Sequence, residues 1–160
     1  MHADARSLLE MLQLQPHPEG GFFREVFRSP LTLALPRGSR ATCTAIWFLL
    51  PAGTFSALHR VRSDEVWNHH DGDPLDLHLL DDAGGHRVVR LGHDYGAGET
   101  SLAVVPAGVW QAAVPRGDRF SLCACTVAPG FDFADFQMPP RDVMLRTFPQ
   151  HLDLVTALTR

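Results

Sequence analysis

The segment PLDLHLLDDAGGHRVVRL, residues 74–91, is the feature that most narrows the folds open to this chain. Leu75, Leu77 and Leu79 occupy every second position, which is the pattern of a strand with one buried face. The residues DDAGG then supply a hairpin loop, and a second strand follows in HRVVRL. The segment therefore predicts an antiparallel hairpin whose leucines face a core.

Similar short runs, separated by Gly, Pro and Asp, extend through most of the chain. They predict strands at residues 22–28, 41–50, 54–61, 65–70, 75–80, 87–91, 102–105, 109–114 and 120–127. Many short strands at regular spacing favour a β-barrel or jelly roll. Helical spacing is found only at 5–14 and in the tail 140–160. The 160 residues thus predict one all-β domain, with a barrel over about 20–136 and short helices at both ends.

Composition narrows the function classes. The formal charge is −4, the chain has no lysine and its arginines are dispersed, which argues against a nucleic-acid partner. The longest apolar run, AIWFLL, is too short to cross a membrane, and the N-terminus lacks the pattern of a secretory signal. Cys43, Cys123 and Cys125 lack the spacing of a zinc or redox site, so we expect reduced thiols in a cytoplasmic protein.

The stretch GTFSALHRVRSDEVWNHHDG holds the residues best suited to chemistry. Strand alternation predicts that Phe55 and His59 share one face, and that Glu65, Trp67 and His69 share one face of the next strand. If RVRSD joins the two strands, His59 and Glu65 point into one interior. Such a pair can bind a metal or a polar ligand, or the two side chains can simply bond to each other.

The spacing of Gly53, His59, Val61, Glu65 and Gly72 resembles the first motif of the cupin superfamily. That motif has a second histidine where Val61 stands here. The stretch VVPAGVWQAAV resembles the second cupin motif, which has a histidine at the position of Gln111.

Further blocks are similar to one largely uncharacterised branch, the cupin-5 family. They are HPEGGFFRE, DEVW, GDPL, VPAGVWQAA and VAPGFDFADF, and they extend from about His17 to Phe136. The resemblance implies a cupin barrel. It leaves the function open, because cupins include isomerases, oxygenases, storage proteins and sensory domains.

The resemblance also bears on metal binding, since a metal-binding cupin usually supplies three imidazoles and a carboxylate. Valine cannot bind a metal, and a neutral amide oxygen is a poor ligand for zinc or iron. A divalent metal would therefore depend on His59, Glu65 and Gln111, or on His69 in a rearranged site.

The alternative is a metal-free pocket, because epimerases with the cupin fold use a histidine as base. His59 and Glu65 would then be the catalytic pair, and a carboxylate beside the imidazole would raise the pKa of the ring. Trp47, Phe55 and Trp67 are the aromatic side chains expected to line such a pocket.

Other residues are expected at the edges of the pocket. Arg24, in the HPEGGFFRE block, would hold an anionic substrate group at the mouth, with His69 and Gln111 as further ligand contacts. Phe131, Phe133 and Phe136 are expected to close one end of the barrel.

The sequence is compatible with three functions. The first is an isomerase-like enzyme acting on a sugar-type or other small polar substrate. The second is a non-catalytic ligand-binding or sensory module, and the third is a metal-dependent enzyme. A homodimer is expected in each case, because open sheet edges favour pairing.

Overall fold

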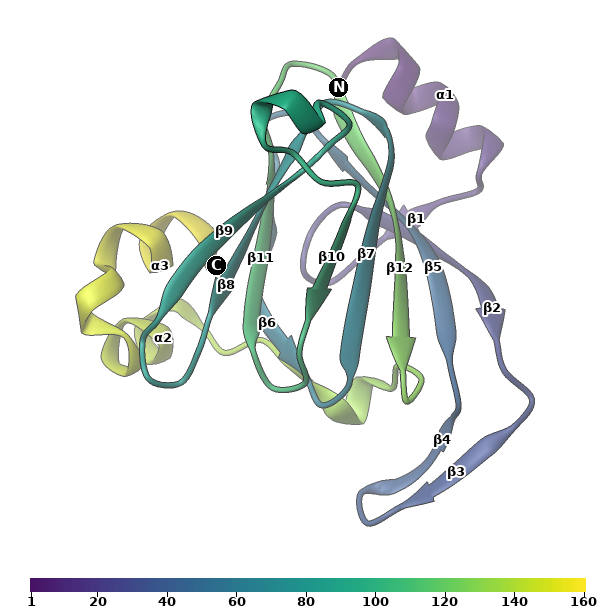
Figure 1. The fold of residues 1–160 in the computed structure, drawn as a ribbon, viewed down its shortest axis with the longest axis vertical. Helices are drawn as coiled ribbons and strands as arrows, with labels where there is room; N and C mark the ends of the chain where they lie inside the picture. The colour runs from purple at the N-terminus through teal and green to yellow at the C-terminus, as the bar shows by residue number, and fades with distance from the viewer.

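The computed structural model describes all 160 residues and contains two antiparallel sheets that face each other across a core (Figure 1). The larger sheet contains, in spatial order, β1 (Gln15–Pro16), β2 (Phe22–Arg28), β5 (Thr44–Pro51), β12 (Phe120–Ala128), β7 (Asp64–Gly72) and β10 (Leu102–Val105). The smaller sheet contains β13 (Phe136–Gln137), β6 (Ser56–Val61), β11 (Trp110–Pro115), β8 (Leu75–Leu80) and β9 (His86–Leu91). The all-β class predicted from the sequence is confirmed.

Leucines at alternate positions of β8 fill the space between the sheets. Leu75, Leu77 and Leu79 are buried in one cluster with Phe48 of β5 and Trp67 of β7. Strand β8 pairs with β9 along its whole length, so residues 74–91 form the hairpin expected from their alternation. This cluster is the core of the barrel.

Helices cover the outer faces of both sheets. Helix α1 (Ala3–Met11) packs on the larger sheet, where Ala5 is buried with Leu49 and Phe120. Helices α2 (Arg141–Thr147) and α3 (Leu152–Leu158) cover the smaller sheet, where Phe148 and Val155 are buried with strand residues. The molecule is therefore layered as helix, sheet, core, sheet and helices (Figure 1).

The element bounds differ from those expected in two respects. Helix α1 ends at Met11, and Gln13 has a φ of 53°, a left-handed conformation that does not continue a helix. Strands β1, β3 (Thr32–Leu35), β4 (Gly38–Ala41) and β13 were not expected. They are very short or largely exposed, so they lack the alternation of apolar residues that identifies a half-buried strand.

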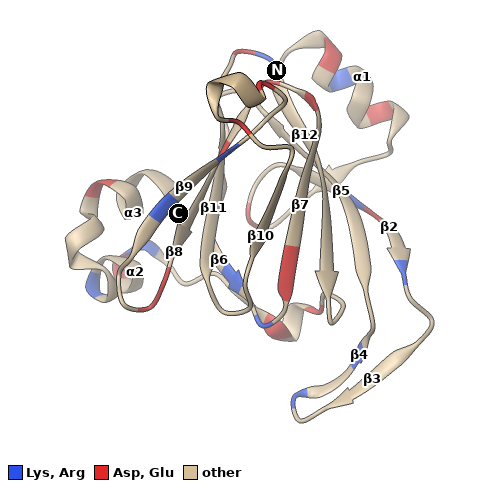
Figure 2. Ribbon diagram, viewed as in Figure 1, with Lys and Arg blue, Asp and Glu red and all other residues tan.

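Charged residues are spread over the molecule and are not gathered on one face (Figure 2). The helices are all too short, and too poor in apolar residues, to cross a bilayer.

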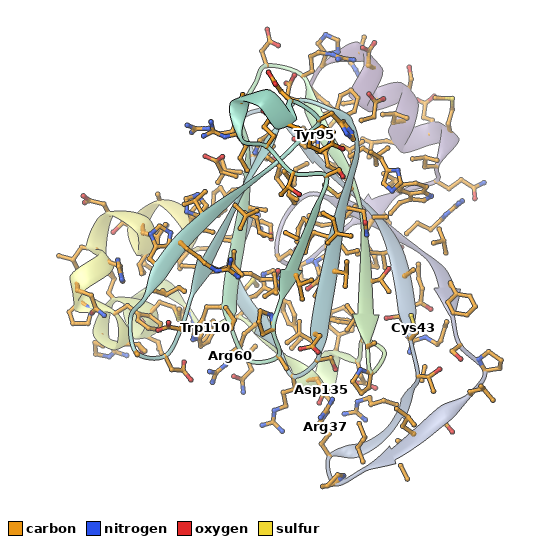
Figure 3. All side chains as sticks on the ribbon, viewed as in Figure 1. Arg37, Cys43, Arg60, Tyr95, Trp110 and Asp135 are labelled. Carbon is orange, nitrogen blue, oxygen red and sulfur yellow. The ribbon has the colours of Figure 1, made fainter.

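One buried carboxylate joins the β3–β4 hairpin to the barrel. Asp135, in the short helical turn η2 (Phe133–Asp135), accepts hydrogen bonds from Nε of Arg37 at 3.0 Å and from Nε of Arg40 at 2.8 Å. Figure 3 shows Arg37, in the turn that joins β3 to β4, close to Asp135. The hydrogen bonds from Arg40 hold the pKa of Asp135 below its usual range. The hairpin is thereby held against the segment that follows β12.

The layering predicts that the C-terminal helices are part of the folding unit. Phe148 is 1% exposed, and we expect Phe148→Ala to lower the free energy of unfolding by about 3–5 kcal/mol through a cavity at the sheet surface. The control is Leu152→Ala in the same segment, where the side chain is 55% exposed and the expected change is within about 0.5 kcal/mol. Urea denaturation measures both, and equal stabilities would show that these helices do not contribute to the core.

Candidate active site in the barrel interior

A cavity of about 310 Å³ opens between the two sheets. This volume lies at the lower end of the range for small-molecule sites, about 300–1,000 Å³. Four of its titratable wall residues come from separate segments: His17 and Glu19 precede β2, His59 lies on β6, and Glu65 is the second residue of β7. The aromatic wall residues are Phe23, Phe48, Trp67, Phe131 and Phe133.

The HPEGG segment is a tight turn that brings Glu19 into the barrel. The Gly20 amide donates to the carbonyl of His17, and the carbonyl of Glu19 accepts from the amide of Ala57 in β6. Gly20 has a φ of +114°, and a Cβ at this position would collide with the carbonyl of Phe55. A glycine is therefore required for the turn to lie directly against β6.

A β-bulge in β6 decides which of its side chains face Glu19. Gln111 of β11 faces His59, and Ala113, two residues later, faces Ser56, three residues earlier in β6. Strand β6 therefore has one extra residue. Ser56 consequently reaches the interior, where its hydroxyl donates to Oε1 of Glu19 at 2.8 Å. The carboxyl is held by this bond from one side.

His59 presents an unprotonated nitrogen to the carboxyl groups. Its Nδ1 lies 2.8 Å from the carbonyl oxygen of Ala57, so Nδ1 carries the proton and Nε2 of the neutral ring has a free lone pair. Nε2 lies 3.4 Å from Oε2 of Glu19. His17 lies on the other side, with Nδ1 3.2 Å from the same oxygen and 3.3 Å from the Glu19 amide that donates to it.

Glu65 is held by an amide behind it. Gln111 donates from Nε2 to Oε2 of Glu65, and its Oε1 accepts from Nε1 of Trp67 at 2.9 Å. Both ends of the Gln111 amide are therefore used, and the orientation of the Glu65 carboxyl is fixed.

Burial sets the charge state of these groups. It raises the pKa of Glu19 to about 8, against the opposing effects of the Ser56 hydrogen bond and the Arg160 guanidinium. It raises the pKa of Glu65 to about 7, although His59 nearby acts in the opposite direction. Burial also lowers the pKa of His17 to about 4, and it lowers that of His59 despite the attraction of Glu65. Near pH 7 the interior therefore holds neutral imidazoles beside Glu19, which is largely protonated, and Glu65, which is partly protonated.

Comparison with known proteins then identifies the family. Residues 6–139 match the family model described as Cupin superfamily (DUF985). This chain is a member of that cupin family. The crystal structure of a Shewanella oneidensis protein is similar over 100% of this chain and 98% of its own, with 36% sequence identity and a TM-score of 0.91.

Two further relatives cover most of the cupin. A hypothetical protein from Leishmania major is 33% identical, with a TM-score of 0.90 over 97% of this chain and 98% of its own. An uncharacterised protein of Saccharomyces cerevisiae is 31% identical over 81% of this chain and 72% of its own length. These similarities support the family and the fold, and the descriptions of the relatives assign no reaction.

The donor set of this cupin does not fit a metal ion. Val61 lines the cavity at the position where the cupin motif has a histidine, and both ends of the Gln111 amide are already bonded. No group of three or more His, Cys, Asp or Glu side chains is arranged to hold a metal.

The structure brings only part of the predicted set together. His59, Glu65 and Trp67 line the cavity, and Gln111 lies directly behind Glu65. His69 is buried on the same face of β7, but its ring contacts His93 at 5.0 Å between centroids, outside the cavity wall. The pKa of His59 is lowered, contrary to the expected rise, because burial outweighs the effect of Glu65.

Two aromatic residues face away from the cavity, contrary to expectation. Trp47 lies on the outer face of β5, beside α1 and 4.9 Å from the ring of His70. Phe55 packs with the residues that bury the C-terminal helices, and Arg160 lies over its ring at 5.6 Å. The bulge in β6 explains why the Phe55 side chain faces away. It reverses the side-chain alternation from which an inward direction of Phe55 was predicted.

Arg24 also points away from the cavity, and Arg28 takes the expected place. Between Glu25 and Phe27 the partner strand advances by one residue only, so β2 contains a second bulge. Arg28 therefore joins Glu25 on the cavity wall, while Arg24 donates to the side chain of Gln13.

Sequence reasoning missed Glu19 and His17 as members of the site. Both belong to the HPEGGFFRE block, and that block was the available signal. Phe131 and Phe133, which were expected to close the barrel, do line the cavity, and Phe136 packs on His59 with centroids 5.3 Å apart.

The raised carboxyl pKa values predict that stability falls between about pH 6.5 and pH 8. In this window the folded protein holds protons on Glu19 and Glu65 that the unfolded chain has lost, since their ordinary pKa is 4.5. Each such proton lowers the free energy of unfolding by up to about 1.4 kcal/mol per pH unit. Below pH 6.5 the lowered pKa values of His17 and His59 oppose this trend, because the unfolded chain then binds more protons at these rings.

Urea denaturation across this pH range checks the prediction. The matched control is the double variant Glu19→Gln, Glu65→Gln, whose stability should be nearly constant over the window. Equal slopes in the two proteins would mean that these carboxyls are ionised in the folded state.

Proposed function

We propose that this cupin is a small-molecule enzyme that transfers a proton within its barrel, as an isomerase or epimerase does. His59 is the general base through Nε2, and the carboxyl group of Glu19 is the proton donor. The observation that carries the proposal is the fixed His59 tautomer, whose free Nε2 lies 3.4 Å from a buried carboxyl on the cavity wall.

The protonation states suit this chemistry near neutral pH. A general base must be unprotonated and a general acid protonated before the reaction begins. The pKa of His59 is lowered by burial, whereas the pKa values of Glu19 and Glu65 are raised to about 8 and about 7. Groups whose environments move their pKa values apart in this way are typical acid–base pairs.

The surrounding residues support the same role. Ser56 donates to Oε1 of Glu19, and Gln111 and Cys125 bond to Glu65, so both carboxyls are held in place on the cavity wall. Phe136 packs on His59, and Phe131 and Phe133 cover the cavity, so little water reaches the reacting groups. A small polar substrate would contact the aromatic wall and these polar groups together.

A deuterium-exchange assay tests the proposal even before a substrate is identified. The protein is incubated in D₂O with mixtures of small polar metabolites, and loss of a C–H signal is followed by NMR. We expect one C–H position to exchange, and His59→Gln to slow that exchange by about 10²–10⁴-fold. Above about pH 8 the reaction should slow as Glu19 loses its proton.

The matched control is His93→Gln, which changes an exposed histidine outside the cavity and should leave the exchange rate unchanged. Exchange that persists in a folded His59→Gln protein would refute the role of His59. A compound that binds in the cavity and shows neither exchange nor conversion would favour the non-catalytic binding module.

We also propose that the cupin forms a homodimer through the β3–β4 arm. Figure 1 shows this arm projecting from the barrel, and large apolar side chains on it and on the end of β2 are exposed. They are Val26, Phe27, Leu31 and Leu33. Exposed apolar surface of this kind is typical of protein–protein contacts.

Sedimentation tests the dimer. We expect the wild-type protein to be a dimer at roughly micromolar concentration, and Leu31→Asp, at a position 70% exposed, to weaken the dimer by more than about tenfold. Leu152→Asp changes an exposed leucine elsewhere and should leave the dimer intact. A monomeric wild-type protein would contradict the proposal.

A further inference from the structure

Acidic side chains outnumber basic ones on the cavity wall. The wall has four carboxyl groups, from Glu19, Glu25, Glu65 and Asp132, and one guanidinium, from Arg28. Its histidines are neutral near pH 7, because burial lowers their pKa values. The cavity therefore has an excess of groups that can carry negative charge.

The single guanidinium is not available to bind an anion. Arg28 donates from Nε and Nη2 to the two oxygens of Glu25, at 2.9 Å and 2.7 Å. It also donates from Nη1 and Nη2 to the carbonyl of Phe131, at 3.2 Å each. The Glu25 charge cancels that of Arg28, and the four contacts leave Arg28 little capacity to bind a carboxylate or phosphate.

Five further wall residues are aromatic. Phe48 and Trp67 meet edge to face with centroids 5.6 Å apart, and Phe131 and Phe133 do the same at 5.0 Å. Aromatic faces attract cations through the ring quadrupole, and this attraction is strongest where water is excluded. Carboxyl groups and aromatic faces on one small cavity are the combination that recognises an ammonium group.

We infer that the substrate of this cavity is a small organic cation, such as a quaternary ammonium compound or a protonated amine. The inference rests on the proposed function in one respect, since it takes the cavity as the substrate site. The sequence predicted an anionic substrate group held by an arginine. The inference here is instead a cationic group held by carboxylates and aromatic rings.

Proton release should accompany binding of such a cation. Glu65, with a pKa of about 7, is the carboxyl that ionises beside a bound cation, whereas Glu19, with a pKa of about 8, keeps its proton near pH 7 as the general acid. The other charged groups facing the cavity are Glu25, Arg28 and Asp132 at the wall, and Arg160, which acts on Glu19 from beside Gly20. Affinity for a cation of fixed charge should therefore rise with pH as Glu65 ionises.

Isothermal titration with matched compounds tests the inference. Choline carries a fixed positive charge, 3,3-dimethylbutan-1-ol has the same shape without charge, and 3,3-dimethylbutanoate carries a negative charge. At about pH 8.5 we expect choline to bind at least about tenfold more tightly than either of the other two. Between about pH 6 and pH 8.5 the affinity for choline should rise by about tenfold, while that for the alcohol stays constant.

Two variants test whether the cavity carboxyl is responsible for the preference for choline. Glu65→Gln should weaken choline binding by about tenfold and leave the alcohol unaffected, whereas Asp142→Asn, at an exposed carboxylate on α2, should change neither. The inference is overturned if the alcohol or the anion binds as tightly as choline, or if choline shows no binding at about 10 mM. Binding is measured without turnover, so this result is independent of the exchange test on His59.

Discussion

The burial of two carboxyl groups beside His59 is the constraint on which the rest of the site depends. An ionised carboxylate is costly where water is excluded, so Glu19 and Glu65 retain protons at a pH where exposed glutamates have lost them. The same burial keeps His59 neutral, and its bond to the Ala57 carbonyl leaves Nε2 free. Near pH 7 a protonated carboxyl group therefore lies beside an unprotonated imidazole nitrogen. Burial and hydrogen bonding alone distinguish these side chains from exposed glutamate and histidine.

The regular strands could be predicted from the sequence because a strand buried on one face has apolar residues at alternate positions. Strand β8 shows this most plainly, since Leu75, Leu77 and Leu79 are buried as their alternation requires. The cupin motifs extended this reasoning to His59 and Glu65, which the structure places on one cavity wall. They also indicated that Val61 and Gln111 stand where a metal-binding cupin has histidines.

The remaining differences arise where the alternation is interrupted. A bulge in β2 turns Arg28 inward in place of Arg24, and a bulge in β6 turns Ser56 toward Glu19 and Phe55 away. One extra residue reverses the direction of every later side chain in a strand. The amino-acid composition of the strand does not show where such a residue lies. Glu19 was missed for another reason, since a turn before β2 inserts it from outside the sheet. These two bulges lie beside the cavity and determine which side chains of β2 and β6 face it.

The protonation state of His59 tests the central claim most directly. Long-range ¹⁵N–¹H NMR on protein labelled at histidine distinguishes the two neutral tautomers and the imidazolium. We expect the His59 ring to be neutral near pH 7, with its proton on Nδ1 and a free Nε2. A proton on Nε2, or a charged ring at that pH, would contradict the assignment of His59 as the base.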